Sequence, residues 1–148
     1  MAQPQMTSID VELQESMQFR AVGEAGVAVS MDSDRAHGGT GSGLGPMELV
    51  LATLGACTGM DVISILVKMR APLAGLEIRI TADRAEEDPK VFTRIALEYV
   101  FSGAGLRPEQ VARAVELSQT RYCSVSAMLR RITEFTYAWR IEGGATPG

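Results

Sequence analysis

The sequence predicts an α+β fold, and three features of its hydrophobic pattern support this. Apolar and polar residues alternate, as in strands, on both sides of a long apolar segment, residues 48–70. That segment is typical of a helix buried on nearly all sides. Helical patterns also come late in the chain, before a last alternating stretch. We therefore expect three strands, a buried helix, two strands, two helices and a last strand, with antiparallel pairing.

The N-terminal strands are expected in Ile9–Arg20 and Val27–Asp32, which are separated by a turn at Gly23–Gly26. Five glycines within residues 38–45 then predict a mobile connector. This connector lacks the Gly-Lys-Ser/Thr ending of a phosphate-binding loop, so we do not expect it to bind a nucleotide.

The long apolar segment is expected to form a helix from Pro46 to about Arg70, stopped by Pro72 and Gly75. Its length alone would also suit a membrane span. However, Asp61 falls near its middle, where an acidic residue costs roughly 2.5–3.5 kcal/mol in a bilayer. A helix surrounded by protein is the better interpretation, and no membrane span is expected.

The second half of the chain completes the fold. Strands are expected at Leu76–Arg84, Phe92–Phe101 and Thr133–Ile141, and helices at residues 105–119 and 124–131. One sheet covers only one side of the apolar helix. A dimer that places two such helices back to back would supply the remaining cover.

Length and composition limit the function classes. With 148 residues the chain is expected to be a single domain, 1–148, with flexible ends at about 1–7 and 143–148. A net charge of −4 argues against nucleic acid as a partner. No secretory signal is recognisable, so a cytoplasmic protein is expected, with its two cysteines as reduced thiols or a transient redox pair rather than a structural disulfide. One histidine, His37, and no CxxC spacing give no support for a metal site.

Cys57 lies in the middle of the apolar helix, on a narrow polar stripe. Residues three or four apart share a helix face, and the stripe consists of Thr53, Cys57, Asp61, Ser64 and Lys68. The stripe gives the thiol a defined surrounding, as a reactive cysteine requires. The alternative is a buried cysteine that behaves as a small hydrophobic residue.

A reactive Cys57 would need help to ionise. A thiolate requires a cation or a helix N-terminus nearby, whereas Asp61 on the same face opposes ionisation. Arg20, in an otherwise strand-like stretch, is a candidate cation, and a solvated strand arginine is the alternative. Gly55 and Gly59 leave room either for substrate or for close packing of the helix.

Cys123 stands at the start of the expected helix 124–131. Helix N–H groups and the macrodipole lower the pKa of a thiol at such a position, and Arg121 is two residues away. Local activation of this thiol is therefore one interpretation, and an incidental half-buried cysteine is the other.

Two segments together resemble a known family. "GPMELVLATLGACTGMDV", residues 45–62, is followed 66 residues after its cysteine by "YCSVSAML", residues 122–129. This pair of motifs is similar to the two cysteine motifs of the OsmC/Ohr family of hydroperoxide-reducing proteins. The resemblance covers most of the chain in the same order of elements.

The resemblance implies a fold and a mechanism. The fold is an intertwined homodimer in which antiparallel sheets wrap around two central helices. In the mechanism, Cys57 reduces an organic hydroperoxide and becomes a sulfenic acid. Cys123 then forms a disulfide with it, and an external dithiol, with no cofactor, reduces the pair. The implied role is defence against oxidative stress.

The chain departs from the family pattern at two positions. In the organic-hydroperoxide branch a glutamate follows the helix proline and an arginine in the N-terminal hairpin holds the thiolate. This chain has Met47 and, near the arginine position, Glu24. Glu48 and Arg20 are the nearest substitutes, so they are carried as candidate catalytic residues. The departures also favour an alternative, a non-enzymatic stress protein that binds a hydrophobic ligand at the dimer interface.

Overall fold

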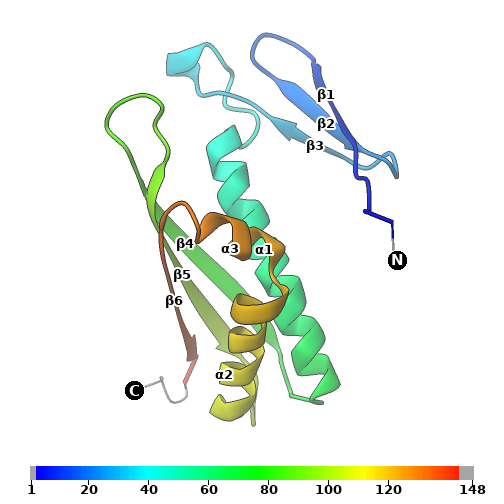
Figure 1. The fold of residues 1–148 in the computed structure, drawn as a ribbon, viewed down its shortest axis with the longest axis vertical. Coiled ribbons are helices and arrows are strands. Elements are labelled where there is room, and N and C mark those ends of the chain that lie inside the picture. Colours follow the sequence, from blue (N-terminus) through cyan, green and yellow to red (C-terminus); the bar gives the residue numbers. More distant parts are fainter. Residues whose placement is uncertain (1–2, 144–148) are drawn as a thin grey trace. The chain divides into compact units, whose positions relative to one another are not determined.

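The computed structural model describes residues 3–143 of the chain. The chain divides into an N-terminal unit, Met1–Val50, and a C-terminal unit, Leu51–Gly148. Helix α1, Pro46–Lys68, begins in the first unit and continues through the second (Figure 1). The expected flexible ends fall partly outside the described residues, and the single domain stays a prediction.

The N-terminal unit contains an antiparallel sheet of three strands in the order β1-β2-β3. The strands are β1 (Ile9–Leu13), β2 (Phe19–Gly23) and β3 (Ala28–Met31). The stretch predicted as strand structure, residues 9–20, contains β1 and the start of β2, which are separated by a turn. Ser16 makes that turn with a φ of 54°, a left-handed conformation that serine rarely adopts. No glycine or proline marks the turn in the sequence.

The glycine-rich segment folds around Asp32, which is buried. The backbone N–H and the hydroxyl of Thr40 donate to Asp32 Oδ2 at 3.1 and 2.7 Å, and those of Ser42 donate at 3.2 and 2.9 Å. A Cβ on Gly39 would overlap the backbone of Ser33, so only glycine fits there. The segment includes a 3₁₀-helix, η1, Arg35–His37. The segment that the sequence predicted as a mobile connector is therefore held by hydrogen bonds to the Asp32 carboxylate.

Helix α1 has local signals at both ends. Pro46 is its first residue, where the missing N–H costs nothing. The Glu48 carboxylate accepts the backbone N–H of Gly45 at 2.8 Å, as the acidic residue of a capping box does. Lys68 stands in the last turn, and Arg70 follows in the left-handed region with a φ of 55°. The predicted end near Arg70 differs from the observed end by two residues.

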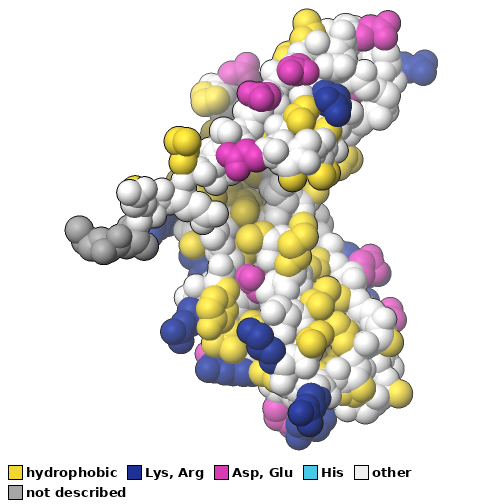
Figure 2. Space-filling model, turned by 90° about the vertical axis from the view of Figure 1, so that its right-hand side faces the viewer, with side chains coloured by type: hydrophobic (Ala, Val, Ile, Leu, Met, Phe, Trp, Pro, Cys, Tyr) yellow, Lys and Arg dark blue, Asp and Glu magenta, His cyan; other side chains and the backbone are white. Residues whose placement is uncertain are grey.

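In the C-terminal unit, one stripe of α1 is fully buried. Its members recur every four residues: Leu54, Thr58, Val62 and Leu66. Other faces of the helix are exposed, and hydrophobic side chains gather on the face of the C-terminal unit seen in Figure 2. The predicted burial on nearly all sides is therefore not present within one chain.

The C-terminal sheet pairs β4 (Gly75–Arg84) with β5 (Phe92–Ser102) antiparallel, as predicted. The third strand, β6 (Glu134–Ile141), lies parallel to β5, and the expected antiparallel pairing is wrong there. The reason is the long connection of residues 103–133, which returns the chain to the start of β5 and allows a parallel crossover.

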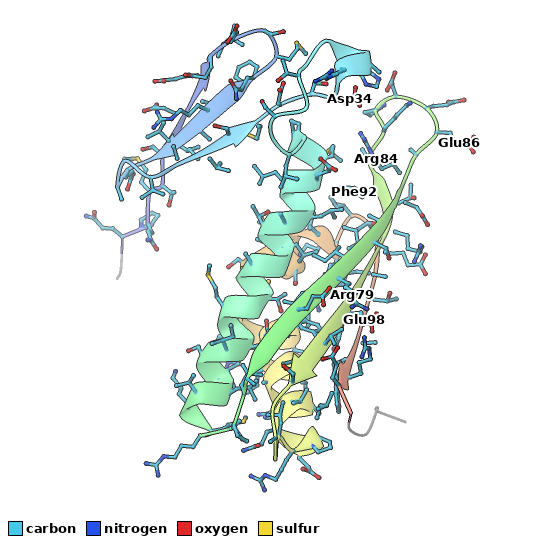
Figure 3. All side chains as sticks on the ribbon, turned by 180° about the vertical axis from the view of Figure 1, so that it is seen from behind. Asp34, Arg79, Arg84, Glu86, Phe92 and Glu98 are labelled. Atoms are coloured by element: carbon cyan, nitrogen blue, oxygen red, sulfur yellow. The ribbon has the colours of Figure 1, made fainter. Side chains whose placement is uncertain are left out.

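That crossover holds α2 (Pro108–Leu117), a π-helix, η2 (Ser118–Tyr122), and α3 (Ser124–Leu129). Alternate residues of β5 are buried, namely Ile95, Leu97, Tyr99 and Phe101. The other face of the sheet carries charges, and Figure 3 labels two cross-strand neighbours there, Arg79 and Glu98. The core of this unit therefore lies between the sheet and the helices.

Within the described residues, α1 is the one helix that is long and apolar enough to cross a membrane by length and composition. The core helix of a soluble protein passes the same test, so the match is weak support for a span.

Candidate functional site

The structure brings the two cysteines together in the C-terminal unit. Cys57 lies midway along α1 and is half-buried, whereas Cys123 precedes α3 and is only 3% exposed. Both thiols are free. They are close enough for the Cys57 sulfur to raise the pKa of Cys123. The two cysteine motifs of the sequence thus meet at one site.

Burial dominates the electrostatics of Cys123. The backbone N–H of Ser126 donates to the sulfur at 3.4 Å, as expected at a helix start. The Ser126 hydroxyl makes no full hydrogen bond with any described residue, but it is close enough to lower the pKa of the thiol further. Burial outweighs both and raises the pKa of Cys123 above its ordinary value. Of the two interpretations that the sequence left open, activation of this thiol by its helix is therefore outweighed by burial.

A buried polar cluster connects α1, which carries Cys57, with the π-helix that precedes Cys123. The Thr58 hydroxyl is 2.7 Å from both Tyr99 OH and Ser118 Oγ. The side-chain amide of Gln119 donates to Tyr99 OH at 2.6 Å and to Thr58 Oγ1 at 3.3 Å. These four side chains are almost inaccessible to solvent, and their hydroxyls and amide satisfy one another.

Two charged side chains, Arg130 and Asp61, form hydrogen bonds with the two ends of this cluster. Arg130 Nη2 donates to Gln119 Oε1 at 2.8 Å, and its guanidinium stacks over the Phe135 ring, 5.5 Å from the centroid. Ser118 Oγ donates to Asp61 Oδ2 at 3.0 Å. Asp61, which the sequence places on the same helix face as Cys57, therefore accepts a hydrogen bond from the π-helix.

Sequence reasoning did not identify this cluster. One signal was available, because Thr58 is the single hydroxyl in the buried series of every fourth residue on α1. Nothing comparable marks its partners, which come from separate elements: Tyr99 from β5, Ser118 and Gln119 from the π-helix, and Arg130 from the residue after α3.

The glycines near Cys57 have a packing role. A Cβ on Gly55 would lie 3.0 Å from Ile80 Cδ1, and one on Gly59 would lie 3.1 Å from Ile78 Cδ1. Both glycines therefore face β4 and let the helix approach the sheet closely. Of the two interpretations that the sequence left open, close packing fits these contacts.

Part of the predicted polar stripe lines a cavity. Asp61, Ser64 and Lys68 border a cavity of about 380 Å³, together with Leu117 and Tyr122. The cavity extends along α1 on the C-terminal side of Cys57. The lining therefore combines polar side chains with the apolar side chains of Ile65, Met69 and Leu117.

The other two candidate residues belong to the N-terminal unit. Arg20 is a half-buried residue of β2, paired in register with Glu12 on β1 and Ser30 on β3. Glu48 is exposed and holds the Gly45 N–H at the start of α1. The observed role of the Glu48 carboxylate is therefore to cap the start of α1. The catalytic roles of Arg20 and Glu48 stay predictions.

A second cavity, of about 480 Å³, lies within the N-terminal unit. Its lining is mostly apolar and comes from the sheet and the residues after it: Val11, Met17, Phe19, Met31, Asp32, Ser33 and Pro46. Across residues 3–143, no group of three or more histidine, cysteine, aspartate or glutamate side chains could hold a metal ion.

Comparison with known proteins places this geometry in a family. A family model described as OsmC-like protein matches residues 39–138. Protein YhfA of Escherichia coli K12 is 42% identical over 96 residues, which cover 65% of this chain and 72% of that protein.

Solved structures agree with the fold. A hypothetical protein from Aquifex aeolicus VF5 matches with a TM-score of 0.81 and 29% identity over 93% of this chain and 96% of that one. The organic hydroperoxide resistance protein OhrB of Bacillus subtilis matches with a TM-score of 0.60 over 91% and 98% of the two chains. Its 15% identity shows the fold alone. The predicted α+β, OsmC-like fold is confirmed, and the chain belongs to the OsmC-like protein family.

Proposed function

We propose that the protein is a two-cysteine peroxidase that reduces organic hydroperoxides, with hydrogen peroxide as a further substrate, in oxidative-stress defence. The observation that carries the proposal is the pairing of a half-buried Cys57 with a buried Cys123 whose pKa responds to it. An accessible thiol can meet a peroxide, and a neighbouring protected thiol can resolve the product. Family members named for hydroperoxide resistance support the same chemistry.

The reaction is a two-electron reduction in two steps. The Cys57 thiolate attacks the outer peroxide oxygen, so an S–O bond forms, the O–O bond breaks, and the alcohol leaves with one proton. The sulfur is oxidised to a sulfenic acid. The Cys123 sulfur then attacks the Cys57 sulfur, the S–S bond forms, and water leaves. Arg20 and Glu48 are proposed to assist the first step.

Turnover requires an external dithiol and no bound cofactor. The dithiol exchanges with the Cys57–Cys123 disulfide, returns both thiols and becomes a disulfide itself. We place the protein in the cytoplasm because a pair that must be reduced after each turnover suits a reducing compartment.

The test is stoichiometric oxidation of the reduced protein. One equivalent of cumene hydroperoxide is added, and the thiols are mapped over time by non-reducing mass spectrometry. We expect a Cys57–Cys123 disulfide to form much faster than a free thiol reacts with the same peroxide. Oxidation at the rate of a free thiol would refute peroxidase activity.

Two variants separate the roles of the cysteines. Cys57→Ser is expected to abolish the fast phase altogether. Cys123→Ser is expected to keep the fast consumption of peroxide but to stop at a sulfenic acid, which dimedone traps on Cys57. A fast phase that survives in Cys57→Ser would reverse the assignment.

A second candidate function is binding of a hydrophobic ligand without catalysis. The apolar cavity of the N-terminal unit, lined by Met17, Phe19 and Met31 among others, favours it. The ligand would be held by van der Waals packing, with few polar groups to set its orientation. Extraction of the purified protein and mass spectrometry of the extract test this function, which predicts a stoichiometric lipid or fatty acid.

We also propose that the protein is a homodimer. Large apolar side chains are exposed on α1, at Met60 (71%) and Val67 (68%), and along β1, at Ile9 (62%) and Leu13 (60%). Within each unit this is more exposed apolar surface than a monomeric protein ordinarily carries, so a second copy is the proposed cover.

A further inference from the structure

The buried polar cluster of Thr58, Tyr99, Ser118 and Gln119 is a chain of hydrogen bonds in which donor and acceptor can be assigned at every step. Arg130 has only donors, so Gln119 Oε1 must be the acceptor of their 2.8 Å contact. This fixes the amide of Gln119, and its NH₂ group faces Tyr99 OH at 2.6 Å and Thr58 Oγ1 at 3.3 Å. The amide therefore donates to both hydroxyls.

The remaining directions follow from the other end of the cluster. The Asp61 carboxylate is the acceptor of its 3.0 Å contact, so Ser118 Oγ donates to Asp61 Oδ2. This uses the single proton of Ser118, so the Thr58 hydroxyl donates to Ser118 Oγ at 2.7 Å, and Tyr99 OH donates to Thr58 Oγ1 at 2.7 Å. The chain thus runs from Arg130 to Asp61 through four uncharged side chains.

The chain joins the two segments that carry the cysteines. Thr58 and Asp61 belong to the turn of α1 that contains Cys57. Ser118 and Gln119 begin the π-helix that leads to Cys123, and the Cys123 N–H donates back to Ser118 O at 2.8 Å. A π-helix is an irregular segment that occurs often at functional sites. Its position here is set by side-chain bonds to α1.

We infer that Thr58, Ser118 and Gln119 are positioning residues, which hold the π-helix against α1 and so keep Cys123 within bonding reach of Cys57. The inference rests on the proposed pairing of these two cysteines. Buried networks whose members are all satisfied fix a unique geometry, since any slip leaves a polar group unpaired. A disulfide needs such accuracy, because its geometry tolerates little deviation.

The test measures how readily the pair forms a disulfide, without any peroxide. Wild type and variants are equilibrated in mixtures of reduced and oxidised dithiothreitol, and the fraction of Cys57–Cys123 disulfide is determined by mass spectrometry after acid quenching. Thr58→Val keeps the shape of the side chain and removes the hydroxyl. Gln119→Met removes the amide at a position farther from Cys57 in case the first variant fails to fold.

Both variants are expected to lower the equilibrium constant for the disulfide about tenfold, equivalent to about 1.4 kcal/mol. Thr58→Ser, which keeps the hydroxyl, is expected to restore the wild-type constant. Thr81→Val is the matched control, since Thr81 is exposed on β4 and lies outside the chain. This control is expected to match wild type.

Two results would overturn the inference. One is a wild-type equilibrium constant in both Thr58→Val and Gln119→Met together with a lower melting temperature, which would show that the chain only supports the fold. The other is a Thr58→Ser variant as impaired as Thr58→Val. Failure of the proposed peroxidase activity would give a different result. The wild type would then form the Cys57–Cys123 disulfide in the dithiothreitol mixtures but would be oxidised only slowly by cumene hydroperoxide.

Discussion

At the scale of single residues, Cys57 and Cys123 differ in their exposure to solvent. Cys123 is 3% exposed and burial raises its pKa, so it rests as a protonated thiol inside the protein. Cys57 is half-buried on a helix face. A reagent from solvent therefore meets Cys57 first, which fits a division between an attacking and a resolving thiol.

The raised pKa of Cys123 makes stability depend on pH in a defined direction. The folded protein favours the thiol form, so the stabilisation is complete below the unfolded pKa of about 8.5 and is lost as pH rises through the folded value. We expect the free energy of unfolding to fall more steeply between about pH 8 and pH 10 in wild type than in Cys123→Ser. Urea titrations with excess reductant measure both slopes, and equal slopes would contradict the prediction.

The sequence predicted the cysteine pair and not the residues that position it. Cys57 and Cys123 stand in motifs that can be recognised along the chain. Thr58, Tyr99 and Ser118 come from three elements, and hydrogen bonds between distant positions leave no periodic pattern. Only the place of Thr58 in the series Leu54, Val62 and Leu66 indicated a polar group facing the core.

At the scale of elements, α1 depends on its two glycines to approach β4. Gly55→Ala would place a Cβ 3.0 Å from Ile80 Cδ1. The crowding is expected to cost about 1–3 kcal/mol, against a gain of about 1 kcal/mol in helix propensity. Ile80→Val removes the crowded methyl group, so in that background Gly55→Ala is expected to be neutral or stabilising.

A double-mutant cycle of the two substitutions, measured by urea unfolding, checks this expectation. A coupling of about 1–2 kcal/mol between positions 55 and 80 is expected, as is typical of residues in direct contact. Additive effects would mean that residue 55 on α1 and residue 80 on β4 are not in steric contact.

The start of α1 gives a second prediction. Glu48→Ala removes the acceptor of the Gly45 N–H and is expected to lower the free energy of unfolding by about 0.5–1 kcal/mol. Glu48→Gln keeps an oxygen acceptor and is expected to recover most of the loss. Thermal unfolding followed by circular dichroism distinguishes the two variants, and equal losses would show that charge rather than the hydrogen bond matters.

Most elements followed from local signals, and the exceptions have physical causes. The start of α1 was predictable because Pro46, its first residue, is itself a local signal for a helix start. The turn at Ser16 was not, because a non-glycine residue adopts a left-handed conformation there. The direction of β6 was not predictable either, since it depends on where the crossover of residues 103–133 returns the chain.

At the scale of the whole molecule, exposed apolar residues dominate the expected behaviour in solution. Met60, Ile63 and Val67 are 71%, 44% and 68% exposed on α1. A charge among them would be costly to bury, so Val67→Glu is expected to convert the proposed dimer into a monomer at micromolar concentration. Sedimentation velocity measures this change.

The control for this variant is Glu109→Gln, which changes the charge of an exposed residue on a different helix, α2, and is expected to sediment as wild type does. A wild type that sediments as a compact monomer at the same concentration would contradict the dimer directly.

The parallel pairing of β6 with β5 also affects how the protein is made. During synthesis β5 emerges from the ribosome well before β6, because the whole crossover lies between them. Until β6 arrives, one edge of β5 has unpaired N–H and C=O groups, which can pair with another nascent chain. Cys57 emerges earlier than β5, and Cys123 emerges with the crossover, so both thiols are synthesised before β6 arrives. The nascent chain is therefore most exposed to aggregation and to incorrect oxidation before its last strand is in place.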